Sequence, residues 1–491
     1  MKVKKVNSTL IREPDLFFGN DKPSIDPKIG LINYGPYGRL SKGKEENLTI
    51  KAGVIGTRNA KEMLESWIDK LHYRISGKLD LSSNRRDVDF PGIGPESPLR
   101  FTIEFDEAYF QAIDEKDITS LGDIANKKDR ILKLLEIYNE KLSDLSTTTD
   151  PNPNIVYLPI SSKTIELCKD PRYKNEMIIF QRKTEKLRGE IPFFNFHHAI
   201  KVSAYKTGNL VSQIVKHSTI SQNGLSNQDP ATIAWNFTVA SYYKATGIPW
   251  KISQLDDETC YVGLSFYTEL EDQKMNTRCS MAHVYLRTGE SQVIRGRPFR
   301  WDRENKGKPY LTSADLASEI ITDVVSLYKR QHNNQNPKRV VIHKSSPFHT
   351  EEIDGFNEAL ANIETVDYVH INEHSGIRFF PKGEDYPPIR GTFIYSGDQA
   401  LLYTTGYIPL LDTYQGGSIP APLLLKTYRM DSSAEQIGKD IMALTKLDWN
   451  NANFNTRLPV TISVSRKVGE ILSEASLQNV TNFPSSYRYY M

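Results

Sequence analysis

The sequence predicts an α/β protein that is built from two successive units. Between residues 48 and 252, apolar strand-like runs alternate with amphipathic helical runs, a pattern that gives a largely parallel sheet covered by helices. From about residue 253, three strand-like runs follow one another and are succeeded by alternating helices and strands. We therefore expect a Rossmann-like first unit and a second unit with a mixed sheet.

The first unit follows a stretch, residues 1–47, that is rich in Gly and Pro and predicts only turns and a short strand. Apolar residues then recur at helical spacing from Ala60 to Leu71, which predicts an amphipathic helix. The other expected elements are strands at 48–57, 98–105 and 154–160, a second amphipathic helix at 129–145 and a loop at 146–154.

The second unit begins with three expected antiparallel strands, which long helical and strand segments follow. The strands are expected at 260–270, 278–289 and 291–301, and the later elements are helices at 313–331, 351–363, 434–447 and 458–472, strands at 339–346, 366–371 and 422–428, and a hairpin at 391–406. Three antiparallel strands followed by helix–strand units is the order of an RNase H-like domain.

Composition describes an ordinary globular chain with no global positive field. Hydrophobic residues make up 38% and charged residues 25% of the 491 residues, and the formal net charge is +2. A nucleic-acid site would therefore have to be a local concentration of cations. Three widely spaced cysteines, a charged N-terminus and the lack of an 18-residue apolar run favour a cytoplasmic protein with neither a signal peptide nor a membrane span.

Four polar side chains between residues 195 and 250 form the candidate site: His197, Lys201, Gln213 and Lys244. On a helix, His197 and Lys201 lie one turn apart on one face. Two cations and an amide beside a helix start would suit a terminal phosphate, because phosphate requires charge-assisted donors. The alternative for each lysine is a solvated basic face, and for Gln213 a polar residue at a helix start.

The string that carries these residues resembles the guide-binding MID domain of Argonaute proteins. The matching features are His197, Lys201, Gln213 after a loop with Gly208, and the run Lys244-Ala-Thr-Gly-Ile-Pro-Trp250. The run from Leu444 to Pro459 resembles a motif near the C-terminus of the PIWI domain. The resemblance implies the short prokaryotic class, with an irregular segment at 1–47, a MID domain at 48–252 and an RNase H-like PIWI domain at 253–491.

The resemblance breaks where a cutting PIWI domain carries the acidic ligands of two metal ions. Ser265 stands at the first Asp position, Ser345 at the second, and Arg466 near the last. Serine is a weak neutral ligand and arginine repels cations, so we expect an inactive PIWI domain. The acids that could rebuild a site are more simply read as solvated charges: Asp256, Asp257, Glu258, Glu319 and Asp323.

The resemblance also implies roles for the candidate residues. His197, or His198 if the register slips by one, takes the place of the residue that caps the guide 5′ phosphate. Lys201 and Lys244 supply charge and Gln213 an amide donor. The C-terminal carboxylate of Met491 is expected to help hold a Mg²⁺ ion that bridges guide phosphates, and a frayed terminus is the alternative.

The function implied is that of a guide-RNA-loaded sensor. It would pair with complementary, single-stranded DNA and activate an APAZ-domain effector protein of TIR, sirtuin-like or nuclease type, as a heterodimer in prokaryotic defence against plasmids or phage. The alternative function is a guided endonuclease with a non-standard PIWI metal site. An unrelated nucleotide-binding enzyme is disfavoured, because neither G-x-G-x-x-G after a strand nor G-x-x-x-x-G-K-[ST] occurs.

Overall fold

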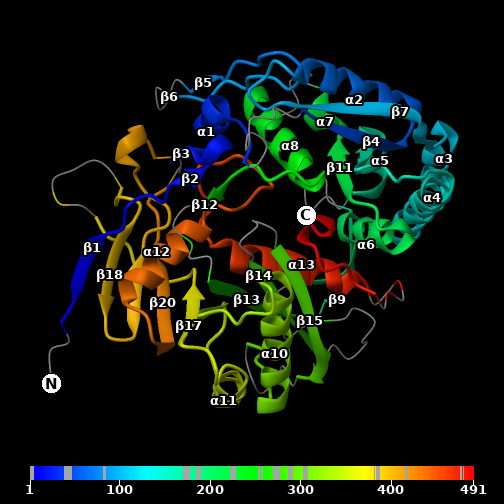
Figure 1. The fold of residues 1–491 in the computed structure, drawn as a ribbon. Coiled ribbons are helices and arrows are strands. Elements are labelled where there is room, and N and C mark those ends of the chain that lie inside the picture. Colours follow the sequence, from blue (N-terminus) through cyan, green and yellow to red (C-terminus); the bar gives the residue numbers. More distant parts are fainter. Residues whose placement is uncertain are drawn as a thin grey trace.

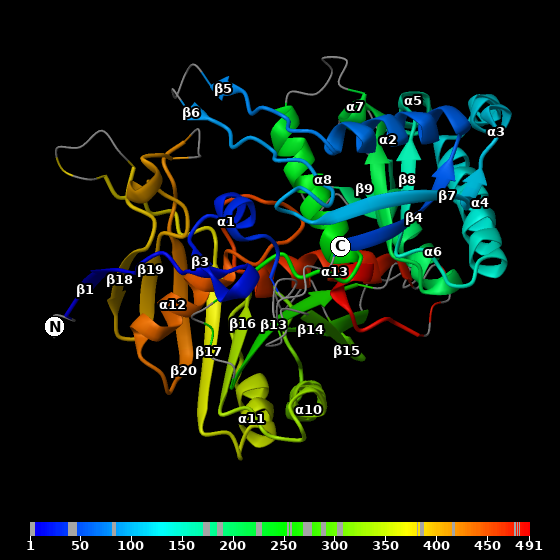
Figure 2. The same cartoon turned by 45° about the horizontal axis from the view of Figure 1, so that its top comes forward.

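The structure is a computed structural model whose two large sheets, of nine and four strands, are each covered by helices (Figures 1 and 2). It describes residues 5–37, 47–80, 85–169, 177–183, 190–221, 228–252, 255, 258–268, 277–285, 291–301, 308–380, 382, 387–414, 418–475, 478, 480 and 482–491. No helix in these ranges is both long and apolar enough to cross a membrane.

The first sheet has four strands, all parallel, in the order β11-β8-β4-β7. Its strands are β4 (Leu48–Gly56), β7 (Phe101–Ala112), β8 (Ile155–Ile160) and β11 (Ser212–Lys216). The helices that cover it are α2 (Arg58–Leu71), α4 (Lys127–Thr148), α6 (Phe196–Gly208) and α8 (Pro230–Lys244). This arrangement confirms the Rossmann-like prediction, including the helix expected from Ala60 to Leu71.

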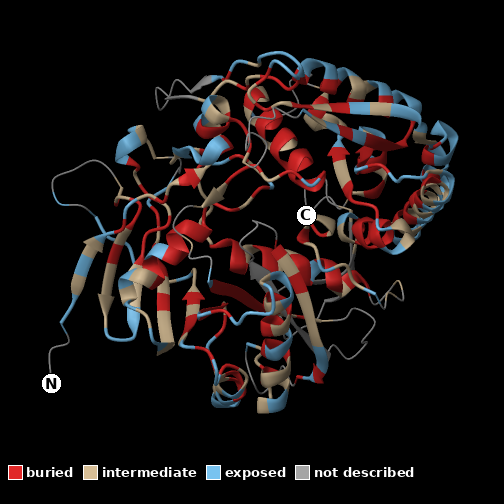
Figure 3. Ribbon diagram, viewed as in Figure 1, coloured by how far each residue is buried: buried red, intermediate tan, exposed pale blue. Residues whose placement is uncertain are grey.

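Strand β8 shows why this layer needs helices on both faces. Every residue of β8 is buried. Ile155 and Tyr157 pack with side chains of α2 and α8, whereas Val156 and Leu158 pack with those of α4 and α6. Successive side chains of a strand point to opposite faces, so one apolar run supplies two cores. The red buried residues in Figure 3 mark these strands and the inner faces of the helices.

The second sheet has nine strands in the order β1-β18-β19-β20-β17-β16-β13-β14-β15. As predicted, β13 (Thr259–Tyr267), β14 (Thr277–Tyr285) and β15 (Ser291–Arg300) are antiparallel neighbours. Strands β16 (Arg339–Lys344) and β17 (Thr365–Asn372) run parallel to β13. The predicted hairpin is β18 (Thr392–Ser396) with β19 (Gln399–Leu402), and β20 (Leu423–Met430) pairs antiparallel with β17 and β19.

Helices cover both faces of this sheet as well. Helices α10 (Ala314–Gln331) and α11 (Thr350–Ala359) share one core with it, and α12 (Ala434–Leu444) and α13 (Val460–Ala475) pack on the other face. Gly263 on β13 permits the contact with α13, because a Cβ there would lie 1.8 Å from the carbonyl oxygen of Thr461. Helix α13 therefore lies directly on the strand that carries Ser265.

The first 47 residues are more regular than the sequence indicated. Strand β1 (Asn7–Leu10) pairs with β18 at the edge of the nine-stranded sheet, and β2 (Leu16–Phe17) lies between β3 (Pro23–Ser24) and β12 (Lys251–Ile252). Helix α1 spans Pro27–Tyr34. The prediction of turns and one short strand was wrong here: β1 and β2 pair with strands more than 200 residues away, which no local pattern shows, and β3 pairs with β2.

The remaining elements are short. They are β5 (Leu79–Asp80), β6 (Arg85–Arg86), β9 (Ile178–Lys183), β10 (Glu190–Asn195), α3 (Glu115–Ser120), α5 (Ser162–Cys168), α7 (His217–Ile220) and 3-10 turns at Gly19–Asp21, Leu121–Asp123, Pro409–Leu411 and Tyr487–Tyr489.

The last residues of the sequence pack between the two sheets rather than fray. The amide of Val293 on β15 donates to the carbonyl of Ser485, at 2.7 Å. The Tyr490 ring lies 5.7 Å from that of Tyr205 on α6, and Met491 is buried. The label C in Figure 1 marks this position between the lobes.

Candidate phosphate-binding pocket

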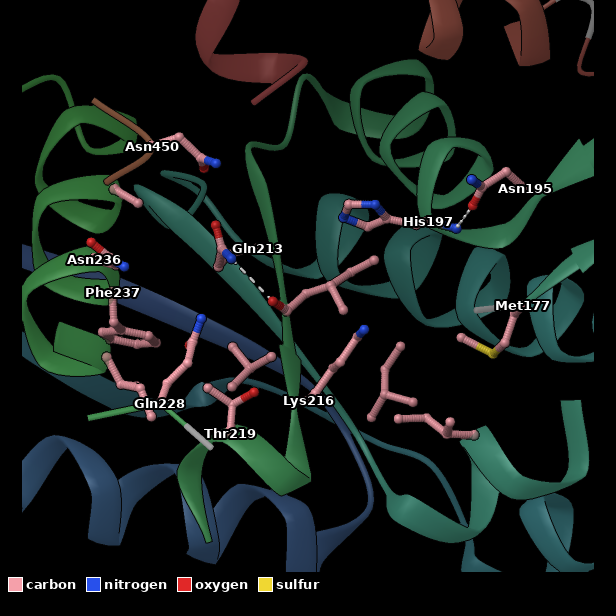
Figure 4. A pocket seen from close by; sticks show the side chains of 16 residues that line it. Met177, Asn195, His197, Gln213, Lys216, Thr219, Gln228, Asn236, Phe237 and Asn450 are labelled. Atoms are coloured by element: carbon pink, nitrogen blue, oxygen red, sulfur yellow. Dashed lines mark hydrogen bonds between the residues drawn. The ribbon is translucent and has the colours of Figure 1, made fainter. Parts of the chain in front are cut away.

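A cavity of about 500 Å³ opens at the carboxyl ends of β8 and β11, between the starts of α6 and α7 and the middle of α8. Its walls combine apolar side chains with the polar side chains of Asn195, His197, Gln213, Lys216, Thr219, Gln228, Asn236 and Asn450 (Figure 4). The carboxyl ends of parallel strands are where ligands bind in open α/β sheets. This place and this lining make the cavity the candidate ligand site.

Helix α6 positions His197 in this cavity. Strand β10 ends at Asn195, whose side chain caps the helix by accepting from the amide of His197 at 3.0 Å. Glu474 on α13 accepts a hydrogen bond from the backbone N–H of Asn195 at 2.6 Å. Burial lowers the pKa of His197, and the charges of Lys201 and His198 lower it further. The residue nonetheless keeps an exposed surface, so we give the neighbouring charges more weight than burial, and the ring is neutral at pH 7.

Lys201 and Lys244 lie behind the cavity wall as a pair of buried cations. The Lys244 ammonium donates to the Ser212 carbonyl at 2.8 Å and to Gln213 Oε1 at 2.5 Å. The Lys201 ammonium donates to a main-chain oxygen of Met491. Gln213 therefore stands between Lys244 and the cavity, and its amide nitrogen donates to the Ile214 carbonyl at 3.0 Å.

The two buried lysines differ in their partners: Lys244 donates to two neutral oxygens, whereas Lys201 donates to an oxygen of Met491, the residue that carries the terminal carboxylate. Burial lowers the pKa of Lys201 to about 8, and burial and the Lys201 charge lower the pKa of Lys244. Among the residues that the structure describes, neither ammonium has a carboxylate side chain as partner. A buried charge without a counter-ion is costly, so an anion that reached both ammonium groups would be bound strongly.

The structure thus places His197 and Gln213 in the cavity lining, with Lys244 behind Gln213, whereas the His198 ring lies 5.9 Å from that of His197 and outside the lining. His198 Nε2 lies 3.9 Å from Glu470 Oε2 on α13, and its side chain is not part of the cavity lining. The expected Mg²⁺ stays a prediction. The Met491 oxygen accepts from the Lys201 ammonium, and no group of three His, Cys, Asp or Glu in the described ranges could hold a metal.

Sequence reasoning missed the polar groups on the far side of the cavity. Asn236 lies on α8, and Asn450 comes from the loop between α12 and α13. The Trp449 ring anchors that loop 4.7 Å from the Tyr243 ring, and the amide of Ala452 donates to Asn236 at 3.0 Å. No local pattern signals this, because the two asparagines are more than 200 residues apart.

The positions of the expected catalytic acids also meet in space, at the carboxyl ends of β13 and β16. Leu264 pairs with Lys344 in the parallel register, so the next residues, Ser265 and Ser345, are neighbours. Ser265 is buried and donates to the carbonyl of Ser465 on α13, at 3.0 Å. The next residue of that helix, Arg466, pairs with Glu373 at 2.7 Å. No acid stands at any of the three positions.

The alternative acids are paired or lie elsewhere. Glu258 pairs with Lys338 at 2.7 Å, at the opposite end of β13 from Ser265. Glu319 on α10 pairs with Arg297. Burial and the Glu319 charge raise the pKa of Asp323. Asp256 and Asp257 lie outside the described residues.

Comparison with known proteins shows similarity in fold. No family model and no curated protein matches the chain. Among solved structures, an Argonaute of Clostridium butyricum bound to a guide DNA and a 19-mer target DNA matches 97% of this chain and 54% of its own, with 18% identity and a TM-score of 0.65. Drosophila Piwi matches 98% of this chain and 56% of its own, with 14% identity and a TM-score of 0.59. For the A. aeolicus Argonaute the shares are 98% and 55%, with 14% identity and a TM-score of 0.57.

The chain therefore has the fold of these Argonaute and Piwi structures, which agrees with the predicted order of a Rossmann-like and an RNase H-like unit. It spans about half the length of the structures it matches.

Proposed function

We propose that this protein holds the 5′-terminal phosphate of a guide nucleic acid in the pocket and pairs the guide with a complementary strand that it does not cut. The observation that carries the proposal is the buried Lys244, whose ammonium donates to two neutral oxygens and whose pKa is lowered by burial and by the nearby Lys201 charge. A terminal phosphate supplies the missing anion, whereas a phosphate within a strand would have to bring both neighbouring nucleotides into the wall.

The class of Argonaute, its guide and target, its partner and its location are proposed from the buried lysines together with the resemblance in sequence. We infer a short Argonaute, loaded with guide RNA and directed at complementary DNA. Its output would pass to an APAZ-domain effector of TIR, sirtuin-like or nuclease type, bound as a heterodimer in the cytoplasm of a prokaryote under attack by plasmids or phage. Ser265, Ser345 and Arg466 support a sensor, because they offer no anionic ligand where a cutting enzyme needs several.

Guide loading requires a local change that the structure makes specific. A phosphate reaches Lys244 only after Gln213 releases it, and it reaches Lys201 in competition with the Met491 oxygen. The released Gln213 amide would then be available to the phosphate as a donor. Lys244 exchanges neutral acceptors, the Ser212 carbonyl and Gln213 Oε1, for an anionic one, which favours the loaded state.

The proposal is tested by what the protein carries in its native cells. Affinity purification followed by sequencing of the bound nucleic acid should recover short strands with 5′ phosphates, and a co-purified protein should be the effector. A purified chain that carries no nucleic acid and binds none when it is offered would contradict the proposal.

Guide affinity is expected to fall as the pH rises through about 8. In the free protein burial lowers the pKa of Lys201 to about 8, below the ordinary value near 10.4, whereas a bound phosphate favours the charged lysine. Binding therefore takes up a proton above pH 8, and linkage predicts a roughly tenfold loss of affinity between pH 7.5 and 9. The check is titration of a labelled 5′-phosphorylated strand at several pH values.

The lowered pKa of Lys201 also makes the folding stability of the free protein depend on pH, but in the opposite direction to guide affinity. The unfolded state binds more protons than the folded state between the lowered and the ordinary pKa of Lys201, so folding stability rises with pH in that window.

A 5′-hydroxyl strand should show no loss of affinity above pH 8. An equal loss for both strands would show that the lysines do not meet the terminal phosphate.

A further inference from the structure

The second place in the molecule where cations gather is the edge at which a cutting enzyme would hold metal ions. We call it the strand-end edge and define it by Ser265, Ser345 and Glu373, the residues at or just beyond the carboxyl ends of β13, β16 and β17. The three strands are parallel neighbours, so their carboxyl ends lie side by side. The arrowhead of β17 in Figure 1 points toward the middle of the molecule, where α13 crosses.

Three cations from separate elements reach this edge. Arg466 on α13 donates to Glu373 Oε1 at 2.7 Å. Arg457, in the loop before α13, donates to the Glu373 main-chain oxygen. Lys308, before α10, donates to the Ser345 carbonyl at 3.3 Å. Glu373 is the single carboxylate that these contacts include, and two of the three cations bond to main-chain oxygens.

The arginines keep donor capacity that the protein does not use. The Arg466 side chain is 37% exposed, and one of its five N–H groups has a partner among the described residues. The Arg457 Nε is buried and has no hydrogen-bond partner among the residues that the structure describes. An exposed guanidinium group with unused N–H groups, such as that of Arg466, matches the oxygen geometry of a phosphodiester.

We infer that the strand-end edge binds a backbone phosphate of the nucleic-acid duplex without metal, with Arg466 as the main contact and Arg457 and Lys308 beside it. The inference rests on the proposed function, because it takes the ligand to be a guide–target duplex. The protein's own cations replace the metal ions that would neutralise that phosphate. Bond cleavage is no part of the inference: the edge holds the strand and leaves it intact.

The roles of Arg466 and Glu373 can be separated by their signs. If the ion pair only stabilised the loop after β17, then Arg466→Gln and Glu373→Gln would weaken duplex binding alike or not at all. If Arg466 binds phosphate, Glu373 competes with that phosphate for the guanidinium. Arg466→Gln should then weaken duplex binding and Glu373→Gln should strengthen it.

The experiment measures affinity of the full chain for a preformed RNA–DNA duplex whose guide strand has a 5′ hydroxyl, in buffer with EDTA and over a range of salt. The 5′ hydroxyl removes the contribution of the phosphate pocket. We expect binding by the unaltered protein without divalent metal, a roughly tenfold loss for Arg466→Gln, and a log–log salt dependence that is smaller by about one unit for this variant. Glu373→Gln should bind at least as tightly as the unaltered protein.

Three outcomes would overturn the inference: duplex binding that needs Mg²⁺, equal losses for the two variants, or an Arg466→Gln variant with unchanged affinity and salt dependence. Its failure is distinguishable from failure of the proposed function. If the phosphate pocket is wrong, duplexes with a 5′ phosphate and a 5′ hydroxyl bind alike while the effect of Arg466 persists. If no duplex binds at all, both proposals are wrong.

Discussion

A protein in which Lys201 and Lys244 are both replaced by methionine is expected to bind a 5′-phosphorylated guide roughly 100-fold more weakly, since each charge-assisted bond contributes about 1.5–3 kcal/mol and the two are not fully additive. Both ammonium groups are buried; Lys244 donates to two neutral oxygens, and Lys201 donates to an oxygen of Met491. The phosphate is the only strong anion proposed for the pocket, so its removal from the guide should mimic the double variant. The measurement is a titration with 5′-phosphorylated and 5′-hydroxyl strands of one sequence.

The free double variant should be about as stable as the unaltered protein or more stable. Methionine has a similar unbranched side chain, and the substitution removes two buried charges, of which Lys244 has only neutral oxygens as described partners. A loss of guide affinity without a loss of stability would therefore point to binding rather than folding. Lys133→Met on α4 is the matched control, because Lys133 is exposed and pairs with Glu136. Equal losses for both guide ends would contradict the assignment.

Purified protein loaded with guide and target is expected to show no cleavage with Mg²⁺ or Mn²⁺. Two-metal catalysis needs several anionic ligands to hold the ions, and the corresponding positions carry Ser265, Ser345 and Arg466. Enzymes commonly accelerate such reactions by more than about 10⁶-fold, so the expected loss covers nearly the whole rate. The check is a gel time course over hours, with a cutting Argonaute as positive control.

A guided endonuclease with a non-standard metal site would give a different result. Cuts at a fixed distance from the guide 5′ end, lost on replacing Glu373 by Gln, would contradict the expectation of an inactive domain. Glu373 is the carboxylate described at the strand-end edge, and the Arg466 guanidinium lowers its pKa, although partial burial opposes this. Cuts that Glu373→Gln leaves unchanged would come from a contaminating nuclease and would be absent from a preparation purified further.

Local patterns were enough to predict most of the fold. Apolar periodicity predicted α2, α10 and most strands of the two large sheets, since these elements bury what their own spacing makes apolar, but it missed β11, where Gln213 lies on a strand and not at a helix start. It could not predict β1, whose partner β18 lies almost 400 residues away and whose own sequence is half exposed. The pairing of an edge strand depends on the neighbouring strand, and the sequence of a short polar segment does not indicate which strand that is.

For the candidate site too, local sequence indicated some features and could not indicate others. The spacing of His197 and Lys201 and the context of Lys244 predicted a phosphate site, which stays a prediction; the structure places His197 in the cavity lining and both lysines behind it. The sequence could not show that Gln213 covers Lys244, that Met491 reaches Lys201, or that Asn450 closes the far wall. Each of these contacts joins segments that only tertiary packing brings together.

The central claim is that the buried Lys201 and Lys244 bind the terminal phosphate of a guide. The most direct measurement compares the Kd of the unaltered protein for two strands of one sequence, one ending in a 5′ phosphate and the other in a 5′ hydroxyl, at pH 7.5 and physiological salt. The account predicts that the phosphate improves binding by at least tenfold, about 1.4 kcal/mol. Equal Kd values for the two strands would contradict it.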